Sequence, residues 1–367
     1  MTPGKVRIGV VGLGYMGTQY ARLLREGGVP RAELTAVCNR HTDKCRPFQD
    51  RAAVFADRAA LFQSGLVDAV IVATPHPDHP ASGIEALRHG LHVLVDKPLA
   101  AQKADAERLL AAHVDRRQVF AAMFQFRTDP RFVRARALLH QGALGPIQRV
   151  HWILTDWFRP DAYYASAPWR GTWKGEGGGV LLNQCPHQLD LLPWLLGMPV
   201  RVRAFCQFGK YHSIEVEDEA TAYLEWADGA TGVFVTSTGE APGTNRLEIA
   251  GDKGRLLVEP ERLLLSRNRV PASQCCRRSN EAFPVLEKDD EEIRFTRWED
   301  GHRLVLQNFT EAILDGAPLI APAAEGLRSL ELANAMLLSS WQERAVALPL
   351  DAEVYRRALA EKINAPG

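Results

Sequence analysis

Residues 6–17 read VRIGVVGLGYMG, an apolar run followed at once by glycines in the spacing G-x-G-x-x-G. The run predicts a buried strand, and residues 15–26 have the apolar spacing of a helix. In such a unit the first glycine permits a tight turn, the second lets a pyrophosphate approach the backbone, and the third lets helix and strand pack closely. The helix start also offers free amides and a favourable dipole to phosphates. The stretch predicts dinucleotide contacts at Gly12, Gly14, Tyr15, Met16 and Gly17, with a plain strand–helix turn as the alternative.

Outside this unit, the first third of the chain keeps alternating between short apolar runs and helical segments. Further strands are expected at residues 34–38, 68–73, 92–95 and 119–123. Helices are expected at residues 77–89 and 104–113. Strands with almost no polar face that alternate with helices indicate a parallel sheet covered on both sides. The sequence therefore predicts an α/β domain at the N-terminus.

The pattern changes near Gln125, where strands begin to follow one another directly. Asp228-Gly229 and residues 251–254 are hairpin signals between them. The expected strands are 219–226, 231–236, 246–250 and 255–258. They indicate a second domain of α+β type with an open, largely antiparallel sheet. Residues 268–298 are polar and interrupted by proline, so they are interpreted as a loop or insertion. The expected closing helices are 301–315, 323–345 and 352–362.

Composition narrows the class of protein. The 367 residues include 44 Lys and Arg against 44 Asp and Glu, and this zero net charge argues against a nucleic-acid binder. The six cysteines show no C-x-x-C pair or other zinc spacing, so no metal is expected. No apolar run is long enough to cross a bilayer, and the first residues lack the pattern of a signal peptide. We therefore expect a cytoplasmic protein without a membrane partner.

The identity of the dinucleotide depends on the residues that end the second strand. An acidic residue there would bind the ribose 2′-hydroxyl of NAD. This chain instead has Asn39 and Arg40 after Cys38, with Lys44 nearby. Asn39 does not repel a 2′-phosphate, and Arg40 can pair with one and stack on adenine. NADP is therefore favoured. NAD stays open, because Asn39 can also hydrogen-bond a hydroxyl and Arg40 can be a solvated loop charge.

Four motifs occur in order along the chain: GLGYMG at 12–17, ATPHPDH at 73–79, VDKP at 95–98 and NQCPHQLDLLPWLLG at 183–197. Together they resemble the glucose–fructose oxidoreductase / inositol dehydrogenase / MocA family. The resemblance implies a Rossmann domain over residues 1–123 and a substrate-binding and oligomerisation domain over 124–367, whose helix 323–345 can pack back on the Rossmann domain. It also implies an NAD(P)-dependent dehydrogenase or reductase of a sugar, inositol or polyol, assembled as a homodimer or homotetramer through the open sheet.

The resemblance also implies the catalytic candidates. Lys97 matches the lysine that contacts the substrate oxygen and the nicotinamide, and Asp96 stands where the family has glutamate. Asn183 and His187 match the family's D-x-x-x-H pair, and Asp190 matches an acidic residue three positions later. Asn183 departs from the pattern, because an amide cannot relay a proton as a carboxylate does. The acid–base role is therefore expected to fall on His187 and Lys97.

These residue types suit the oxidation of a secondary alcohol. Hydride transfer requires the hydroxyl proton to leave and the developing alkoxide to be stabilised. Lys97 is suited to stabilising the alkoxide, and burial beside an oxidised nicotinamide would lower its pKa. His187 suits the proton, although a hydrogen-bonded core histidine is the alternative. Residues 183–196 are expected to form one helix, with Asn183, His187 and Asp190 on one face.

Further candidates come from strand ends and from an aromatic segment. The carboxyl ends of parallel strands bind ligands, so we assign to the cofactor Thr74, Pro75, His79, Asp96, Lys97 and Gln125. Residues 155–173 are rich in aromatic residues and arginine, which stack on sugar rings and bind hydroxyls, although an interface patch is the alternative. We expect substrate contacts at Trp157, Tyr163, Trp169, Arg170, Lys97, Asn183 and His187. The run GEGGGV at 175–180 is expected to be a loop that passes close to a ligand or to a helix start.

Three functions are open at this point. The first is a sugar or polyol dehydrogenase or reductase. The second is a glycosidase that uses a tightly held NAD to oxidise, eliminate and re-reduce its substrate. The third is a non-catalytic sugar sensor on the same fold. Lys97 and His187 argue against the third, because a sensor has no need of a lysine at the hydride site.

Overall fold

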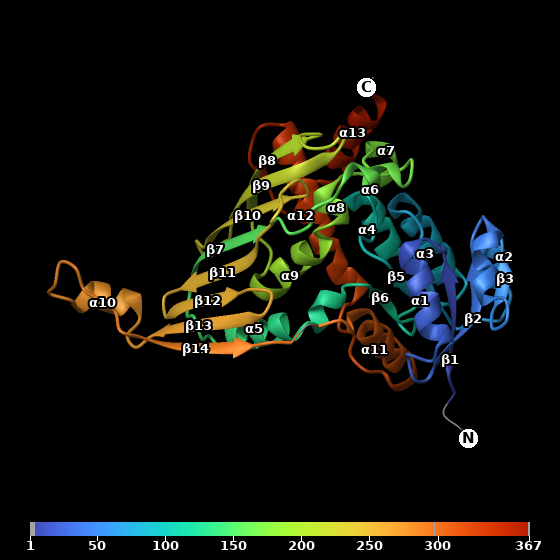
Figure 1. The fold of residues 1–367 in the computed structure, drawn as a ribbon, viewed down its shortest axis with the longest axis horizontal. Helices are drawn as coiled ribbons and strands as arrows, with labels where there is room; N and C mark the ends of the chain where they lie inside the picture. Colours follow the sequence, from blue (N-terminus) through green and yellow to red (C-terminus); the bar gives the residue numbers. More distant parts are fainter. Residues whose placement is uncertain (1–3, 297, 366–367) are drawn as a thin grey trace.

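The structure, a computed structural model, describes residues 4–296 and 298–365. Its strands form two sheets with helices around and between them (Figure 1). The smaller sheet, on the right of Figure 1, is made by strands near the N-terminus. The larger sheet, on the left, is made by the strands that come after these, from Ile147 onward.

The first sheet has six parallel strands in the order β3-β2-β1-β4-β5-β6. They are β1 Val6–Val11, β2 Ala32–Cys38, β3 Ala53–Phe55, β4 Ala69–Val72, β5 His92–Val95 and β6 Phe120–Ala122. The connecting helices are α1 Tyr15–Arg25, α2 Arg58–Gln63, α3 His79–Arg88 and α4 Lys103–Ala111, with the 3-10 helices η1 Thr42–Phe48 and η2 His76–Asp78. The strand order reverses between β1 and β4, and ligands of such sheets bind in the crevice at that point.

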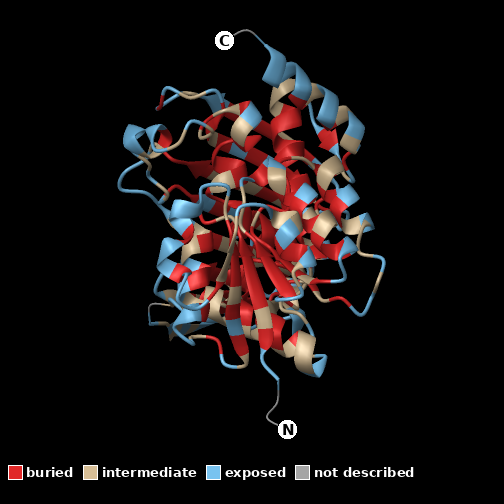
Figure 2. Cartoon of the chain, turned by 90° about the vertical axis from the view of Figure 1, so that its right-hand side faces the viewer, coloured by how far each residue is buried: buried red, intermediate tan, exposed pale blue. Residues whose placement is uncertain are grey.

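Helices cover both faces of this sheet, which explains its continuous apolar strands. β4 is buried at every position, and the buried residues run along the central strands in Figure 2. One covering helix, α11 Gly301–Asp315, comes from far along the chain. Its Val305 and Phe309 share a core with Ile8 and Leu94. Residues near the C-terminus thus complete the packing of the N-terminal sheet.

The second sheet has nine strands in the order β14-β13-β12-β11-β7-β10-β9-β8-β15. They are β7 Ile147–Leu154, β8 Arg201–Phe208, β9 Glu217–Glu225, β10 Thr231–Ser237, β11 Asn245–Gly251, β12 Gly254–Val258, β13 Arg262–Asn268, β14 Lys288–Arg294 and β15 Val346–Ala347. β7 and β10 run parallel, and the other neighbours are antiparallel. Trp152 and Phe234 are buried on one face, while Ile153, Phe205 and Tyr223 are exposed on the other. The alternation is that of a sheet with one covered face, as the sequence predicts.

The segment 268–298 is not the loop that its polarity indicated. It contains α10 Ala272–Arg278, which projects from the body in Figure 1, and the edge strand β14. β14 has the charged sequence KDDEEIR, and ion pairs hold it to β13, such as Arg267–Glu291 at 2.7 Å and Arg262–Glu292 at 3.3 Å. An edge strand held by cross-strand charges shows no apolar alternation in its sequence. The prediction of a loop was therefore wrong for this strand. Residue 297 lies outside the described residues.

Helix α12 Ala323–Trp341 lies between the two sheets and contacts β8, β6 and α4. Its Ser339 Oγ accepts a hydrogen bond from Ala204 N at 2.9 Å, and its Asn334 Oδ1 accepts one from Lys103 N at 2.8 Å. The remaining helices are η3 Gln125–Thr128, α5 Pro130–His140, α6 Asp161–Ala165, α7 Trp173–Glu176, α8 Val180–Asn183, α9 Pro186–Leu196 and α13 Ala352–Asn364. Within residues 4–296 and 298–365, no helix combines the length and apolarity that a membrane crossing requires.

Candidate active site

A cleft of about 790 Å³ opens where β1, β2, β4 and β5 end. It brings together most of the residues that the sequence assigns to the cofactor. They are Gly12, Gly14, Tyr15, Met16, Asn39, Arg40, Thr74, Pro75, His79, Asp96 and Lys97. Trp169, Arg170 and Asn183, which come after the first sheet in the chain, line the same cleft. The candidate site therefore lies between the two parts of the molecule.

The glycine turn has the geometry that a dinucleotide requires. Gly12 has a φ of +93°, and a Cβ there would lie 2.6 Å from Ala73 O. A Cβ on Gly17 would lie 1.8 Å from Gly12 O, so α1 packs directly on the turn. Gly14 differs, because it lines the cleft and the space beside it is open. The exposed backbone at the start of α1 therefore fits a pyrophosphate.

The end of β2 places Asn39 and Arg40 in the cleft with different tasks. Asn39 Oδ1 accepts a hydrogen bond from Leu13 N at 3.1 Å, and its Nδ2 donates to His41 O at 2.9 Å. Asn39 therefore fixes the glycine turn to the next loop. The Arg40 side chain is 82% exposed and pairs with Asp78 at 2.9 Å. An exposed guanidinium with a single surface partner is free to exchange that partner for a phosphate.

Strand β5 delivers Asp96 and Lys97 to the cleft. Asp96 Oδ1 accepts hydrogen bonds from Lys97 N at 2.8 Å and from Tyr20 OH at 3.2 Å. Lys97 Nζ donates to Asn183 O at 2.8 Å, so it reaches across to helix α8. Burial lowers the pKa of Lys97, and the charges of Asp96 and Glu176 act in the opposite direction. The peptide bond between Lys97 and Pro98 is cis.

A buried carboxylate that the sequence motifs did not single out lies beside Asn183. Glu176, at the end of α7, is 1% exposed. Its Oε1 accepts a hydrogen bond from Asn183 Nδ2, and its Oε2 accepts one from Gly171 N at 2.7 Å. Burial raises the pKa of Glu176, while these hydrogen bonds and the charges of Arg170 and Lys97 lower it. The sequence signal for this site is one acidic residue within the glycine-rich run GEGGGV.

The expected helix over 183–196 is two helices, α8 and α9, with a break at Gln184 and Cys185. Pro186 begins α9, because proline has no N–H to donate and disfavours helical backbone in the residue before it. Asn183 therefore ends one helix, while His187 lies in the first turn of the next. The prediction that they share a helical face is wrong, and Pro186 was the signal against it.

His187 is buried near Lys97 and packs against Gln125 and Phe126. Its Nε2 is 3.1 Å from Gln125 Nε2, and its ring stacks on Phe126 with centroids 4.8 Å apart. Its Nδ1 has no partner among the described residues. Burial lowers the pKa of His187 well below the usual value, and the charge of Lys97 lowers it further. The imidazole is therefore neutral near pH 7 and able to accept a proton.

Asp190, the third member of the expected helical face, is engaged elsewhere. Its two carboxylate oxygens accept hydrogen bonds from Arg127 at 2.7 and 2.8 Å, and both side chains are buried. Arg127 also contacts Glu325 of α12. This buried network joins η3, α9 and α12, so Asp190 supports the fold.

The motif ATPHPDH supplies two buried histidines. The ring nitrogens of His79 lie 2.8 Å from Pro98 O and 2.6 Å from Thr74 O, so His79 bridges the ends of β4 and β5. His76, which the sequence motifs did not single out, lines the cleft and has Nδ1 3.4 Å from Glu176 O. Burial lowers the pKa of both rings. The visible signal for His76 was a second histidine in the same motif.

The aromatic segment forms a stack in which arginines alternate with rings. The Arg170 guanidinium lies 4.2 Å from the ring centre of Tyr163 and 4.5 Å from that of Trp169, and it donates to Tyr163 OH at 2.5 Å. Arg159 lies 5.1 Å from the ring centre of Tyr163 and 5.3 Å from that of Trp157. Trp169 and Arg170 line the cleft, while Tyr163 and Trp157 lie behind them. The structure therefore brings two of the four predicted residues directly to the cleft.

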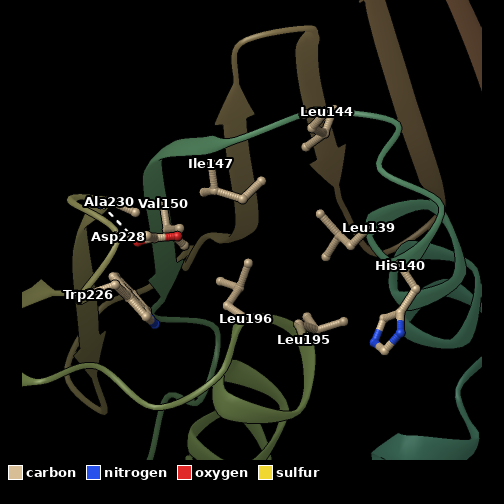
Figure 3. Close-up of a pocket in the computed structure, with 11 residues that line it drawn as sticks. Leu139, His140, Leu144, Ile147, Val150, Leu195, Leu196, Trp226, Asp228 and Ala230 are labelled. Atoms are coloured by element: carbon tan, nitrogen blue, oxygen red, sulfur yellow. Dashed lines mark hydrogen bonds between the residues drawn. The ribbon is translucent and has the colours of Figure 1, made fainter.

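A second, smaller cavity lies away from these groups. Its volume is about 180 Å³, and leucine side chains from α5 and α9 line it together with Val150 of β7 and Trp226 (Figure 3). It contains none of the predicted site residues. Among the described residues, no cluster of three or more His, Cys, Asp or Glu side chains could hold a metal ion.

Comparison with known families identifies the chain. Residues 6–124 match the oxidoreductase family with an NAD-binding Rossmann fold, and residues 132–257 match the GFO/IDH/MocA C-terminal domain. The chain belongs to the GFO/IDH/MocA family of oxidoreductases. Family membership confirms the resemblance that the four motifs predict, and it confirms an oxidoreductase with an NAD-binding Rossmann domain.

Several known proteins are similar along almost the whole chain. Inositol 2-dehydrogenase 1 of Saccharopolyspora erythraea is 28% identical over 345 residues, which cover 90% of this chain and 93% of that protein. The WlbA dehydrogenase from Chromobacterium violaceum, solved with NADH and UDP-GlcNAcA, is 27% identical and has a TM-score of 0.80 over 96% of this chain and 98% of that one. Levoglucosan dehydrogenase, solved with NADH and levoglucosan, is 19% identical with a TM-score of 0.79 over 94% and 100%, a likeness of fold.

Proposed function

We propose that this protein is an NAD(P)-dependent dehydrogenase or reductase of a secondary alcohol or ketone in a sugar, inositol or related polyol. The observation that carries the proposal is Lys97, a lysine that follows β5 into the cleft and donates to Asn183 O of α8 at 2.8 Å. The open glycine turn provides a dinucleotide site in the same cleft. Relatives named inositol 2-dehydrogenase support a polyol substrate, and WlbA, solved with a nucleotide sugar, supports a sugar.

The roles follow from the surroundings of each residue. When bound, the nicotinamide supplies hydride transfer. Lys97 donates a hydrogen bond to the substrate oxygen and stabilises negative charge there, and its lowered pKa lets it share the hydroxyl proton. His187, neutral because it is buried, accepts or returns that proton. Asn183 orients the substrate and, through its backbone oxygen, Lys97.

The two parts of the chain divide the remaining tasks. We assign residues 1–123 to the dinucleotide, with Thr74, Pro75 and His79 beside the nicotinamide half. We assign residues 124–367 to the substrate and to neighbouring subunits. Trp169 and Arg170 contact the sugar from the cleft wall. Tyr163 and Trp157 hold that wall in place through the arginine stack, and Gln125 does the same for His187.

NADP is the proposed preference within the NAD(P) class. Arg40 is exposed at the end of β2 and has a single surface carboxylate as partner. Lys44 and Arg58 line the same end of the cleft. Arg58 is held by Glu85 at 2.7 Å, so Arg40 and Lys44 are the cations assigned to a 2′-phosphate, since charge-assisted contacts to phosphate are the stronger ones.

A homodimer or homotetramer is the proposed assembly. Phe205, Thr221, Val235 and Ile153 form one row across four strands on the exposed face of the second sheet. Phe205 and Ile153 are exposed to solvent in the single chain. An apolar row of this kind on an open sheet fits a second copy of the same face, as in an isologous dimer.

The test is turnover with a panel of substrates. The purified protein is mixed with NADP or NAD and with sugars, inositols or glycosides, and the absorbance of reduced nicotinamide is followed. We expect net reduction with at least one polyol and a higher kcat/KM with NADP. No turnover across the panel would contradict the proposal. Retained cofactor together with glycoside cleavage would instead support the oxidising glycosidase.

A further inference from the structure

We infer that Glu176 is a positioning residue of the active site, which orients Asn183 and supplies the second negative charge that supports Lys97. The inference rests on the proposed function, because it assigns Glu176 a task in the work of Lys97. Glu176 acts through its neighbours. It does not line the cleft, and its side chain is buried behind Asn183.

Two successive contacts lead from the carboxylate to the lysine. Glu176 Oε1 accepts from Asn183 Nδ2, and Asn183 O accepts from Lys97 Nζ at 2.8 Å. The other oxygen, Oε2, is anchored by Gly171 N at 2.7 Å. The carboxylate therefore fixes both the side chain and the backbone of Asn183. That backbone oxygen is what holds the ammonium group of Lys97 in the cleft.

Glu176 is one of the few charged groups that act on the pKa of Lys97. Negative charge on Asp96, Glu176 and Cys185 raises the pKa of Lys97, and the charge of Arg170 lowers it. The histidines that interact with Lys97 are His76, His187 and His302. The groups that face Glu176 are Lys97, Arg170, Tyr163, Tyr164 and Glu217. Burial raises the pKa of the Cys185 thiol, so the carboxyl groups that act on Lys97 are those of Asp96 and Glu176.

The pattern also accounts for Asn183. An amide in that position cannot carry charge, but it can donate to a carboxylate one contact further from the cleft. The Asn183–Glu176 pair thus keeps one negative charge near Lys97 while presenting a neutral group to the substrate.

Glu176→Gln tests the charge with little change in shape. Because the Asn183 amide can rotate and accept from the new amide, both hydrogen bonds of the buried side chain can still form. We expect the Lys97 pKa to fall by about one unit. The limb of the kcat/KM pH profile that is set by ionisation of Lys97 should shift to lower pH by the same amount. We expect kcat to fall about 10-fold or more.

A second variant moves the charge rather than removing it. In Glu176→Gln combined with Asn183→Asp, the carboxylate stands one contact closer to Lys97, and we expect the pH limb to return to the wild-type position or above it. Glu176→Asp keeps the charge but shortens the side chain, so it should lower kcat without moving the limb. Glu215→Gln is the matched control, because Glu215 Oε2 accepts from Trp173 N at 2.9 Å at the start of the same helix, α7.

The decisive readout does not require turnover. Lys97 is labelled with acetic anhydride across a pH series in the resting protein, and mass spectrometry of its peptide gives the amine pKa. The inference is supported if the Lys97 pKa falls in Glu176→Gln, returns when Asn183→Asp is added, and stays unchanged in Glu215→Gln. An unchanged Lys97 pKa in a folded Glu176→Gln protein overturns it. If the pKa shifts but no substrate is turned over by the wild type, the electrostatic link between Glu176 and Lys97 stands and the proposed function fails.

Discussion

A charged pair at the end of a buried strand is costly unless each member has partners. At the end of β5 those partners come from three parts of the chain. Asp96 is held by Tyr20 and by the backbone of Lys97, and Lys97 reaches Asn183. Lys97 is thereby kept at the mouth of a dinucleotide site with a lowered pKa. In the proposed function, such a site suits a reaction in which negative charge develops on a substrate oxygen.

Lys97→Ala removes the group that stabilises that oxygen. We expect kcat to fall about 10²–10⁴-fold, the range typical of a lost acid–base group, while NADPH binding changes little. The measurement is steady-state kinetics with a fluorescence titration of NADPH. Lys97→Arg is the matched control, since it keeps the charge but cannot share a proton, and it should retain binding with low kcat. Intact turnover in Lys97→Ala would contradict the mechanism.

Arg40→Ala should weaken NADP more than NAD. Loss of one charge-assisted contact to the 2′-phosphate raises the KM for NADP about 10-fold and leaves the KM for NAD nearly unchanged. Kinetics with both cofactors measure the ratio. Arg25→Ala, which removes a surface guanidinium paired with Asp50, serves as the control. Equal changes for both cofactors would argue against 2′-phosphate recognition by Arg40.

The sequence predicts some residues of the site and cannot predict others. Lys97 and the three motif glycines stand in local patterns, because a strand and its following turn determine what they face. Glu176 stands in no such pattern. Its partners, Gly171 and Asn183, lie five and seven residues away along the chain, and the signal next to it is only its place in the glycine-rich run GEGGGV.

At the level of elements, helix α8 depends on a buried acid. Glu217 of β9 is fully buried, and its Oε1 accepts from Leu181 N at 3.0 Å. Its Oε2 has no partner within the described residues. Burial raises the pKa of Glu217 from 4.5 to about 7. A carboxyl with a raised pKa binds its proton more tightly in the folded protein than in the unfolded one.

The stability of the protein should therefore fall as pH rises from about 4.5 to about 7, by up to about 1.4 kcal/mol per pH unit from this group. Below pH 4.5 the contribution is fully present. Glu217→Gln cannot ionise, so its free energy of unfolding should exceed that of the wild type by about 3 kcal/mol at pH 8 and match it near pH 4. Urea unfolding at the two pH values measures this. Unfolding curves of the wild type and the variant that coincide at both pH values would contradict this prediction.

The elements that the sequence predicts best are those whose burial pattern is local. β1, β5 and α11 carry continuous apolar runs or clear helical spacing, and their bounds agree closely with prediction. β3 and α2 were not predicted, because a three-residue strand and a six-residue helix are too short to show a period. β14 was mistaken for a loop because ion pairs, not apolar contacts, hold it.

At the scale of the whole molecule, the open face of the second sheet is the surface that remains to be covered. Its inner face packs on helices, and the row from Phe205 to Ile153 faces outward. Helix α12 fastens this sheet to the Rossmann domain. Subunits that meet through the open face would therefore hold their clefts in fixed relation to each other.

Phe205→Glu should dissociate such an assembly. A charge placed in the apolar row is desolvated without a partner when a second copy covers it, which costs several kcal/mol. Light scattering should show a dimer or tetramer for the wild type and a monomer for the variant at micromolar concentration. Phe283→Glu is the control, because Phe283 is 92% exposed and lies outside this sheet. A monomeric wild type would contradict the prediction.

The glycine-rich run beside the site sets limits for engineering. A Cβ on Gly177 would lie 2.6 Å from Ala101 Cβ, and one on Gly179 would lie 2.0 Å from Glu217 O. These glycines approach protein rather than an open cleft, so a mutant library that varies them would consist mostly of misfolded chains. Substitutions at Trp169 and Arg170 would instead change side chains that line the cleft. A library for altered substrate range should hold residues 175–180 constant and randomise the arginine stack.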